Sequence, residues 1–78
     1  MKKRKLFVGY ENLIRDGDRV TKRDLVLRDE QGKKVWSVHT WCNERSEAEA
    51  DVMMIQFLDT IKEGVELLDS DNHPVLYR

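Results

Sequence analysis

The sequence predicts an α+β domain, with an antiparallel three-stranded meander followed by one long helix and a short C-terminal strand or hairpin. Two observations lead to this prediction. An amphipathic segment with helical spacing occupies residues 46–63, and the residues before it alternate between apolar and polar side chains with hairpin-length breaks. Because the sheet and the helix each have an apolar side to bury, we expect them to pack as a two-layer sandwich.

The first strand is expected over residues 6–10, where apolar side chains fall on alternate positions. Residues 11–20 allow two interpretations. Leu13 and Ile14 either extend the strand to a hairpin turn at Asp16-Gly17-Asp18, which we favour, or anchor an irregular loop.

The second and third strands are expected over residues 21–28 and 34–42, joined by a turn in which Gly32 can adopt positive φ. The third strand is rich in β-branched and aromatic residues, and both of its faces are partly apolar. One face carries Trp36, Val38, Thr40 and Cys42, and the other carries Val35, Ser37, His39 and Trp41. One tryptophan should therefore point away from the helix.

The helix is expected to begin at Ser46, which with Glu49 forms a capping-box pattern, and to stop at Gly64. Its buried stripe should consist of Ala50, Met54, Phe57, Leu58 and Ile61, with Met53 beside them. Residues 65–69 then read as a short strand and residues 70–74 as a turn. Residues 75–77 read as a final strand or an extended tail, which Pro74 would place at an edge.

Length and charge favour one small domain over residues 1–78, with residues 1–4 as a frayed basic tail. The formal net charge is -1, but residues 1–40 carry 11 Lys and Arg against 6 Asp and Glu, whereas residues 41–78 carry 3 against 9. The single cysteine fits a reducing compartment, and no apolar run reaches membrane-spanning length. We therefore expect a cytoplasmic protein.

The chain offers no set of residues suited to catalysis. His39 and Cys42 should leave opposite faces of a strand, and no glycine-rich phosphate or dinucleotide pattern is present. Asp69-x-Asp71-Asn72 resembles the start of a calcium loop but lacks its central glycine, because Pro74 stands there. We expect no enzymatic activity, no metal and no cofactor.

Protein binding is the function that the sequence favours. Candidate contacts are an outward tryptophan, the second apolar line of the helix and its acidic first half, namely Trp36, Trp41, His39, Val52, Ile55, Glu47, Glu49 and Asp51. In size, charge and lack of cofactor motifs, the chain resembles small phage-encoded accessory proteins. That resemblance implies an inhibitor or regulator that occupies another protein's surface, such as an enzyme with a basic groove. A homodimer is a further expectation.

The alternative function is nucleic-acid binding. A Gly-Lys turn at residues 32–33, an aromatic strand and a capped helix give a layout similar to the sheet-type DNA-binding domains of phage integrases and to double-stranded-RNA-binding folds. This resemblance implies a basic sheet face that uses Lys22, Arg23, Lys33 and Lys34 with an exposed tryptophan.

Overall fold

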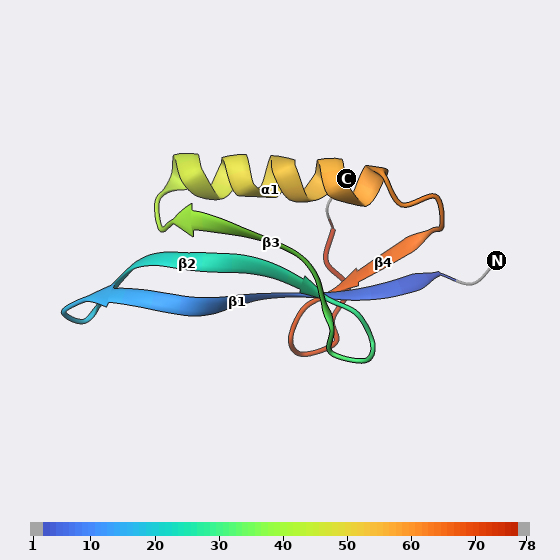
Figure 1. Cartoon of the computed structure of the whole chain (residues 1–78), viewed down its shortest axis with the longest axis horizontal. Helices are drawn as coiled ribbons and strands as arrows, with labels where there is room; N and C mark the ends of the chain where they lie inside the picture. Colours follow the sequence, from blue (N-terminus) through green and yellow to red (C-terminus); the bar gives the residue numbers. More distant parts are fainter. Residues whose placement is uncertain (1–2, 77–78) are drawn as a thin grey trace.

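A computed structural model describes residues 3–76 as a four-stranded sheet with one helix lying along one side (Figure 1). The elements are β1 (Arg4–Asp16), β2 (Arg19–Arg28), β3 (Lys34–Trp41), α1 (Glu44–Asp59) and β4 (Val65–Leu68). The strand order is β3-β2-β1-β4. The predicted α+β class, the three-stranded meander and the position of the helix after it are confirmed. Strand β1 includes Arg4 and Lys5 at its start, whereas the predicted frayed tail covers residues 1–4.

The fourth strand makes the sheet mixed rather than purely antiparallel. β4 runs parallel to β1, with Arg4 opposite Val65 and Phe7 opposite Leu68. The reason is the connection through the helix. Strands β1 and β3 both run antiparallel to β2, and α1 carries the chain back along the sheet before β4 begins. A strand reached through such a helical crossover runs parallel to the strand that precedes the helix.

The ambiguous segment after the first strand forms the favoured hairpin. A two-residue turn at Gly17 and Asp18 joins β1 to β2, and Gly17 has a φ of +64°. The turn extends past the N-terminal end of α1 (Figure 1). Within β1, Asn12 has a φ of +53° and the register shifts between Glu11 and Ile14. Asn12 is therefore part of a β-bulge, which interrupts the regular alternation of the strand.

The turn between β2 and β3 is held by Asp29, whose Oδ1 accepts backbone N–H groups from Gln31 and Lys33, each at 2.9 Å. A second register shift follows, because Leu27 lies opposite Trp36 whereas Arg28 lies opposite Lys34. Val35 is the extra residue. It packs against the core together with Trp36, so the strict alternation that placed Val35 on the opposite face is wrong at this bulge.

The helix starts and ends earlier than predicted. Asn43 is the N-cap, and its Oδ1 accepts the backbone N–H of Ser46 at 2.9 Å, so the predicted capping box at Ser46 does not form. At the other end, the Thr60 N–H and hydroxyl both donate to the Phe57 carbonyl. These local bonds satisfy the last turn at Asp59, and Gly64 lies in the connection to β4 instead of capping the helix.

The core lies between α1 and the sheet, and the predicted helix stripe supplies one side of it. Its buried residues are Leu6, Leu25, Leu27 and Leu67 from the strands and Ala50, Met54 and Leu58 from α1. Phe57 and Ile61 of the predicted stripe are partly buried against this cluster, and Met53 is exposed. The helix therefore faces the sheet as its spacing indicated.

The C-terminal segment folds back on β4. Asp69 Oδ1 accepts the backbone N–H groups of His73 and Asp71, which lower the pKa of this carboxyl in that order of importance. Beyond this turn, Leu68 and Pro74 form a single antiparallel bridge, and the Val75 N–H donates to Leu67. Tyr77, the end of the predicted final strand, lies outside the described residues.

Candidate functional site

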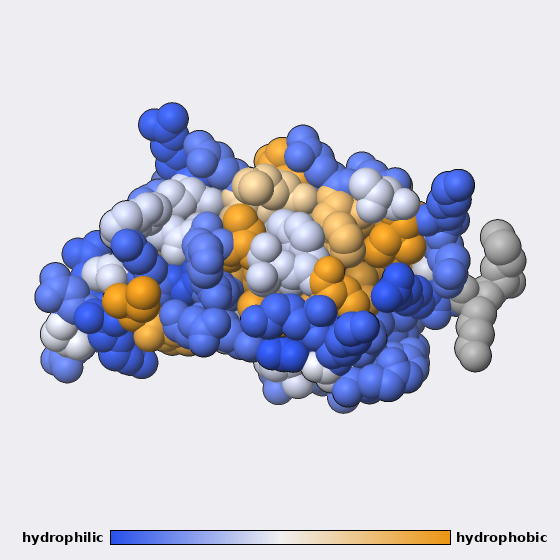
Figure 2. All heavy atoms as spheres, viewed as in Figure 1, coloured by the Kyte–Doolittle hydropathy of each residue, from blue (hydrophilic) through white to orange (hydrophobic). Residues whose placement is uncertain are grey.

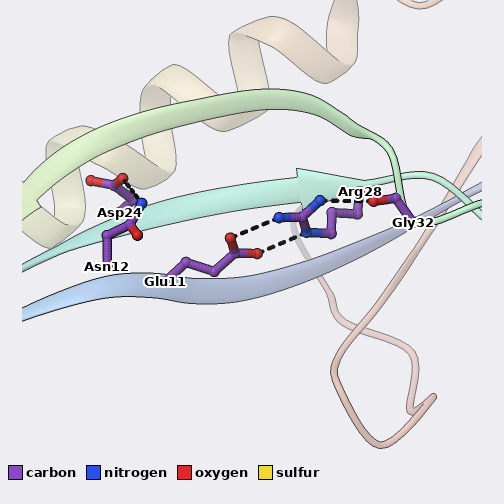
Figure 3. Close-up of polar contacts among 5 residues, drawn as sticks. All are labelled: Glu11, Asn12, Asp24, Arg28 and Gly32. Carbon is purple, nitrogen blue, oxygen red and sulfur yellow. Dashed lines mark hydrogen bonds and ion pairs between the residues drawn. The ribbon is translucent and has the colours of Figure 1, made fainter.

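The two faces of the sheet differ in what covers them. Leu25 and Leu27 of β2 point towards α1 and belong to the core, whereas Asp24, Val26 and Arg28 alternate with them and point to the other side. We call this second side, which α1 does not cover, the open face. Two groups of polar contacts lie on it, and both join neighbouring strands (Figure 3).

The first group is centred on Asp24, which is only 8% exposed. Asn12 Nδ2 donates to Asp24 Oδ2 at 2.8 Å, and His39 Nδ1 contacts Asp24 Oδ1 from the opposite strand. The bulge at Asn12 brings its amide to this position. The hydrogen bond from Asn12, followed by that from His39, lowers the pKa of Asp24, so the carboxyl is held in its charged form.

The second group joins Glu11 of β1 to Arg28 of β2. Arg28 Nε and Nη2 donate to the two carboxylate oxygens of Glu11, each at 2.8 Å, and Arg28 Nη1 donates to the Gly32 carbonyl at 2.7 Å (Figure 3). The hydrogen bond from Arg28 lowers the pKa of Glu11, and the same contact raises the pKa of Arg28. This fork ties both central strands to the β2–β3 turn.

Next to Asp24, the open face is hollowed. The hollow has a volume of about 350 Å³, and its lining consists of Asn12, Ile14, Lys22, Arg23, Asp24, His39, Thr40 and Trp41. Trp41 is 53% exposed and Ile14 is 56% exposed. Lys22 Nζ lies 4.0 Å from the centre of the Trp41 ring, which places a cation over the indole. We call this site the Trp41 hollow.

The Trp41 hollow combines two chemistries. A charged carboxylate with two fixed partners lies beside an exposed indole and an exposed aliphatic side chain. Such a surface can bind an apolar side chain together with a hydrogen-bonding group that meets the exposed His39 ring. Within residues 3–76, no group of three or more His, Cys, Asp or Glu side chains has the geometry to hold a metal ion.

The structure brings Trp41 and His39 together, but it separates Trp36 from them. Trp36 is partly buried under α1, where its ring stacks on Phe57 with the centroids 5.9 Å apart and the planes 17° apart. Trp41 is the tryptophan on the open face. The sequence left the choice between the two indoles open, because it could not show which side the helix would cover.

The predicted helix contacts lie on a different surface. Val52 is 54% exposed and lines a shallow hollow on α1 with Ala48, Glu49, Met53 and Gln56, whereas Ile55 is partly buried. Glu47 forms an ion pair of 2.8 Å with Arg23, and Glu49 forms one of 3.3 Å with Arg45. Asp51 is exposed and lines a separate groove beside Tyr10 and Met54.

The four basic residues predicted for nucleic acid do not form one patch. Lys22 lies opposite Trp41, and Lys34 lies opposite Arg28 at the other end of β3, next to Lys33. Six strand residues separate these ends, or about 20 Å. Arg23 is engaged elsewhere, because its guanidinium lies 3.6 Å from the Tyr10 ring and bonds Glu47.

Sequence reasoning missed Asn12, Ile14 and Asp24 as members of this site. A signal for two of them was present. Asn and Asp are disfavoured inside strands, so Asn12 in a strand that continues to a hairpin indicates a bulge, and Asp24 directly before the apolar run at residues 25–27 indicates a partnered carboxylate.

Comparison of the chain with protein-family models, with curated proteins and with solved structures finds no significant match. In the part of the chain from residue 3 to residue 76, no helix is both long enough and apolar enough to cross a membrane.

Proposed function

We propose that this protein is a non-catalytic binding module that occupies the surface of another protein and acts as its inhibitor or regulator. The observation that supports this proposal is the Trp41 hollow, where a half-exposed indole and Ile14 flank the buried carboxylate of Asp24. Aromatic side chains beside a fixed polar group are typical of the residues that contribute most to protein interfaces.

The chemistry of the hollow indicates what a partner should present. An apolar side chain would cover Trp41 and Ile14, and a hydrogen-bonding group beside it would meet the exposed His39 ring, which contacts the Asp24 carboxylate. The acidic residues of α1 should contribute less, because Glu47 and Glu49 already have cationic partners within the chain.

The test compares variants of the Trp41 hollow with a matched variant on the helix. Proteins captured from source-cell extracts by the native chain and by Trp41→Ala would be quantified, and the affinity of each captured partner would then be measured with purified components. We expect Trp41→Ala to weaken binding by about 30-fold or more, which is the range of interface hot spots. Val52→Ala, an equally exposed residue on α1, should change it little.

Equal binding by the native chain and by Trp41→Ala would contradict the proposal. Circular dichroism of Trp41→Ala provides the control for folding, because Trp41 is half exposed and lies outside the core cluster.

A second function, binding of single-stranded nucleic acid, is favoured by one contact. The Lys22 ammonium beside the exposed Trp41 ring could pair with a phosphate while a base stacks on the indole. Salt titration separates the two functions, since nucleic-acid binding should weaken steeply as salt rises. Absence of binding to oligonucleotides at low salt would remove this candidate and leave the first.

A further inference from the structure

The outer edge of β3 is unpaired in the described chain, because β3 is the terminal strand of the sheet. One hydrogen bond shows which of its groups are free. The Cys42 N–H donates to the Thr21 carbonyl at 3.0 Å, in register with the β2–β3 pairing. Since paired and outward residues alternate in an antiparallel ladder, Trp36, Val38 and Thr40 bond to β2. The backbone groups of Ser37 and His39 therefore point away from the sheet.

The other edges carry features that hinder strand addition. β4 has only four residues, and the Val75 N–H and the Leu68–Pro74 bridge lie along it. The part of β1 that extends past β4 contains the bulge at Asn12 and the charged pair Arg15 and Asp16. Between Val35 and Trp41, in contrast, β3 has no lysine, arginine, acidic residue or proline. An edge without these features readily pairs with another strand.

Apolar side chains next to this edge are incompletely covered. Trp36, Val38 and Phe57 are only partly buried, although they pack against the core. A hollow of about 150 Å³ lies between the end of β3 and α1, and its helix side includes Glu49 and Met53. The same two residues also line the hollow around Val52. A continuous strip with exposed apolar residues therefore runs from the β3 edge onto α1, the helix that lies beside β3 (Figure 1).

On the face drawn in Figure 2, hydrophilic residues cover most of the surface, and the apolar residues lie mainly in its middle, with a smaller group at the lower left. Val52 and Met53 are the two large apolar residues that α1 exposes. Adjacent exposed apolar residues of this kind mark interaction surfaces more often than isolated ones do.

We propose that two copies of this chain form a dimer by antiparallel pairing of their β3 edges, centred on Val38. In this register Ser37 of each copy lies opposite His39 of the other, which makes four backbone hydrogen bonds. Paired residues project to the same side of the sheet, so Val38 of each copy meets its equivalent on the helix side, and the Val52–Met53 strips of the two helices face each other.

The charges favour a second copy as the occupant of this edge. Lys33 and Lys34 precede the free stretch of β3, and Glu44 in the first turn of α1 follows it. Antiparallel pairing brings the basic start of β3 in one copy to the end of the dimer where α1 of the other copy begins, so opposite charges gather at each end. The acidic halves of the two helices lie at opposite ends of the dimer and do not repel each other at close range.

The first test is the oligomeric state of the full chain by sedimentation equilibrium. We expect a dimer with a dissociation constant of about 0.1 mM or below. Ser37→Pro removes an N–H group that points outward but breaks no hydrogen bond to β2, so the sheet can still form. The dissociation constant of the dimer should rise by about 100-fold or more. Ser37→Ala keeps the N–H and should remain dimeric. A native chain that stays monomeric, or a Ser37→Pro chain that still dimerises, would overturn the proposal.

Hydrogen exchange provides a readout specific to this edge. The amides of Ser37 and His39 should become protected as the protein concentration rises, whereas those of Val38 and Thr40 should be protected at every concentration. Rapid exchange of Ser37 and His39 in a dimeric sample would place the interface elsewhere and overturn the proposal.

A charge exchange keeps the proposal testable even if Ser37→Pro fails to fold. Lys34→Glu and Glu44→Lys chains should each dimerise about ten-fold more weakly than the native chain, because each places like charges at both ends of the dimer. Mixing the two variants should restore native affinity as a heterodimer. Arg19→Glu, at the hairpin tip, is the control. No recovery of affinity on mixing would overturn the proposed strand register. A native chain that is monomeric but still captures a partner through Trp41 would overturn the dimer and leave the proposed binding function standing.

Discussion

The two faces of the sheet share the same strands but are stabilised in different ways. Along β2, Leu25 and Leu27 pack under α1, whereas Asp24 and Arg28 on the open face bond to residues of β1 and β3. The hydrophobic effect has no preferred direction, so burial of apolar side chains holds α1 against the sheet without determining which individual side chains touch. The polar groups need exact partners, and they therefore determine where Asn12, Glu11 and His39 lie.

This difference suggests a division of roles. The helix side provides most of the free energy of folding, because its residues leave water almost completely. Ion pairs on an exposed face contribute little net stability, since water competes for the same groups. The open face can consequently carry the Trp41 hollow and its polar neighbours without a large cost to folding, which is what a binding surface requires.

The largest expected effect comes from substitutions of adjacent residues that point to opposite faces. Leu27 is 0% exposed under α1, and Val26 is 1% exposed on the open face. Leu27→Ala should lower the free energy of unfolding by about 2–5 kcal/mol, since it leaves a cavity in the core. Val26→Ala removes less apolar volume and should cost about 1–2 kcal/mol. Urea denaturation of both variants measures the difference, and a larger loss for Val26→Ala would contradict the division between the faces.

The next largest effect concerns Phe57, which lies at the edge of the core between α1 and the sheet. Full burial of Phe57, which its place in the helix stripe suggested, would make Phe57→Ala cost about 3–5 kcal/mol. Phe57 is only partly buried and stacks on Trp36 at one side of the core. We therefore expect a loss of about 2 kcal/mol for the monomer. A loss as large as that of Leu27→Ala at high protein concentration would mean that a second copy covers Phe57, and repeating the measurement after dilution would separate the two causes.

Alternation and turn chemistry in the sequence were enough to predict the helix side of the fold. The spacing of Ala50, Met54 and Leu58 predicted the buried side of α1, and the Asp16-Gly17-Asp18 turn predicted the β1–β2 hairpin. Both are local patterns, in which residues a few positions apart determine the outcome. The same reasoning explains why one tryptophan had to lie outside, although not which one.

The open face could not be predicted in the same way. Asp24 finds Asn12 and His39 only because a bulge and two strand registers bring the three together, and neither register follows from local sequence. The parallel pairing of β4 likewise depends on where the helix returns the chain. The helix ends differ because Asn43 and Thr60 compete with Ser46 and Gly64 as caps, and each pattern is locally acceptable.

A smaller effect should follow from removing the bulge residue of the open face. Asn12→Ala loses the hydrogen bond to Asp24 and places a non-glycine residue without a polar side chain at a φ of +53°. We expect a loss of about 1–2 kcal/mol from these two causes. Asn12→Gly removes the hydrogen bond but accepts positive φ, so it should recover part of that loss. Equal losses for the two variants, measured by urea denaturation, would show that backbone strain at the bulge has no part in the effect.

The smallest effect is the pH dependence that the open face adds. Hydrogen bonds lower the pKa values of Asp24 and Glu11 in the folded chain, whereas in the unfolded chain these groups should titrate near their ordinary values of about 3.9 and 4.3. The unfolded state therefore binds more protons in the acid range. The resulting stabilisation is present above about pH 4 and is lost as pH falls through the lowered values.

Asp24→Asn isolates the contribution of one group to this acid response. The variant should unfold with a shallower dependence on pH below about 4, because one of the groups that bind a proton on unfolding is gone. Asp51→Asn removes the same charge at an exposed position on α1 and is the control for the change in net charge. Urea midpoints measured from neutral to acid pH give the comparison. An unchanged slope for Asp24→Asn would mean that Asn12 and His39 do not hold the carboxyl in its charged form, and the His39 ring in the Trp41 hollow would then lack its charged partner.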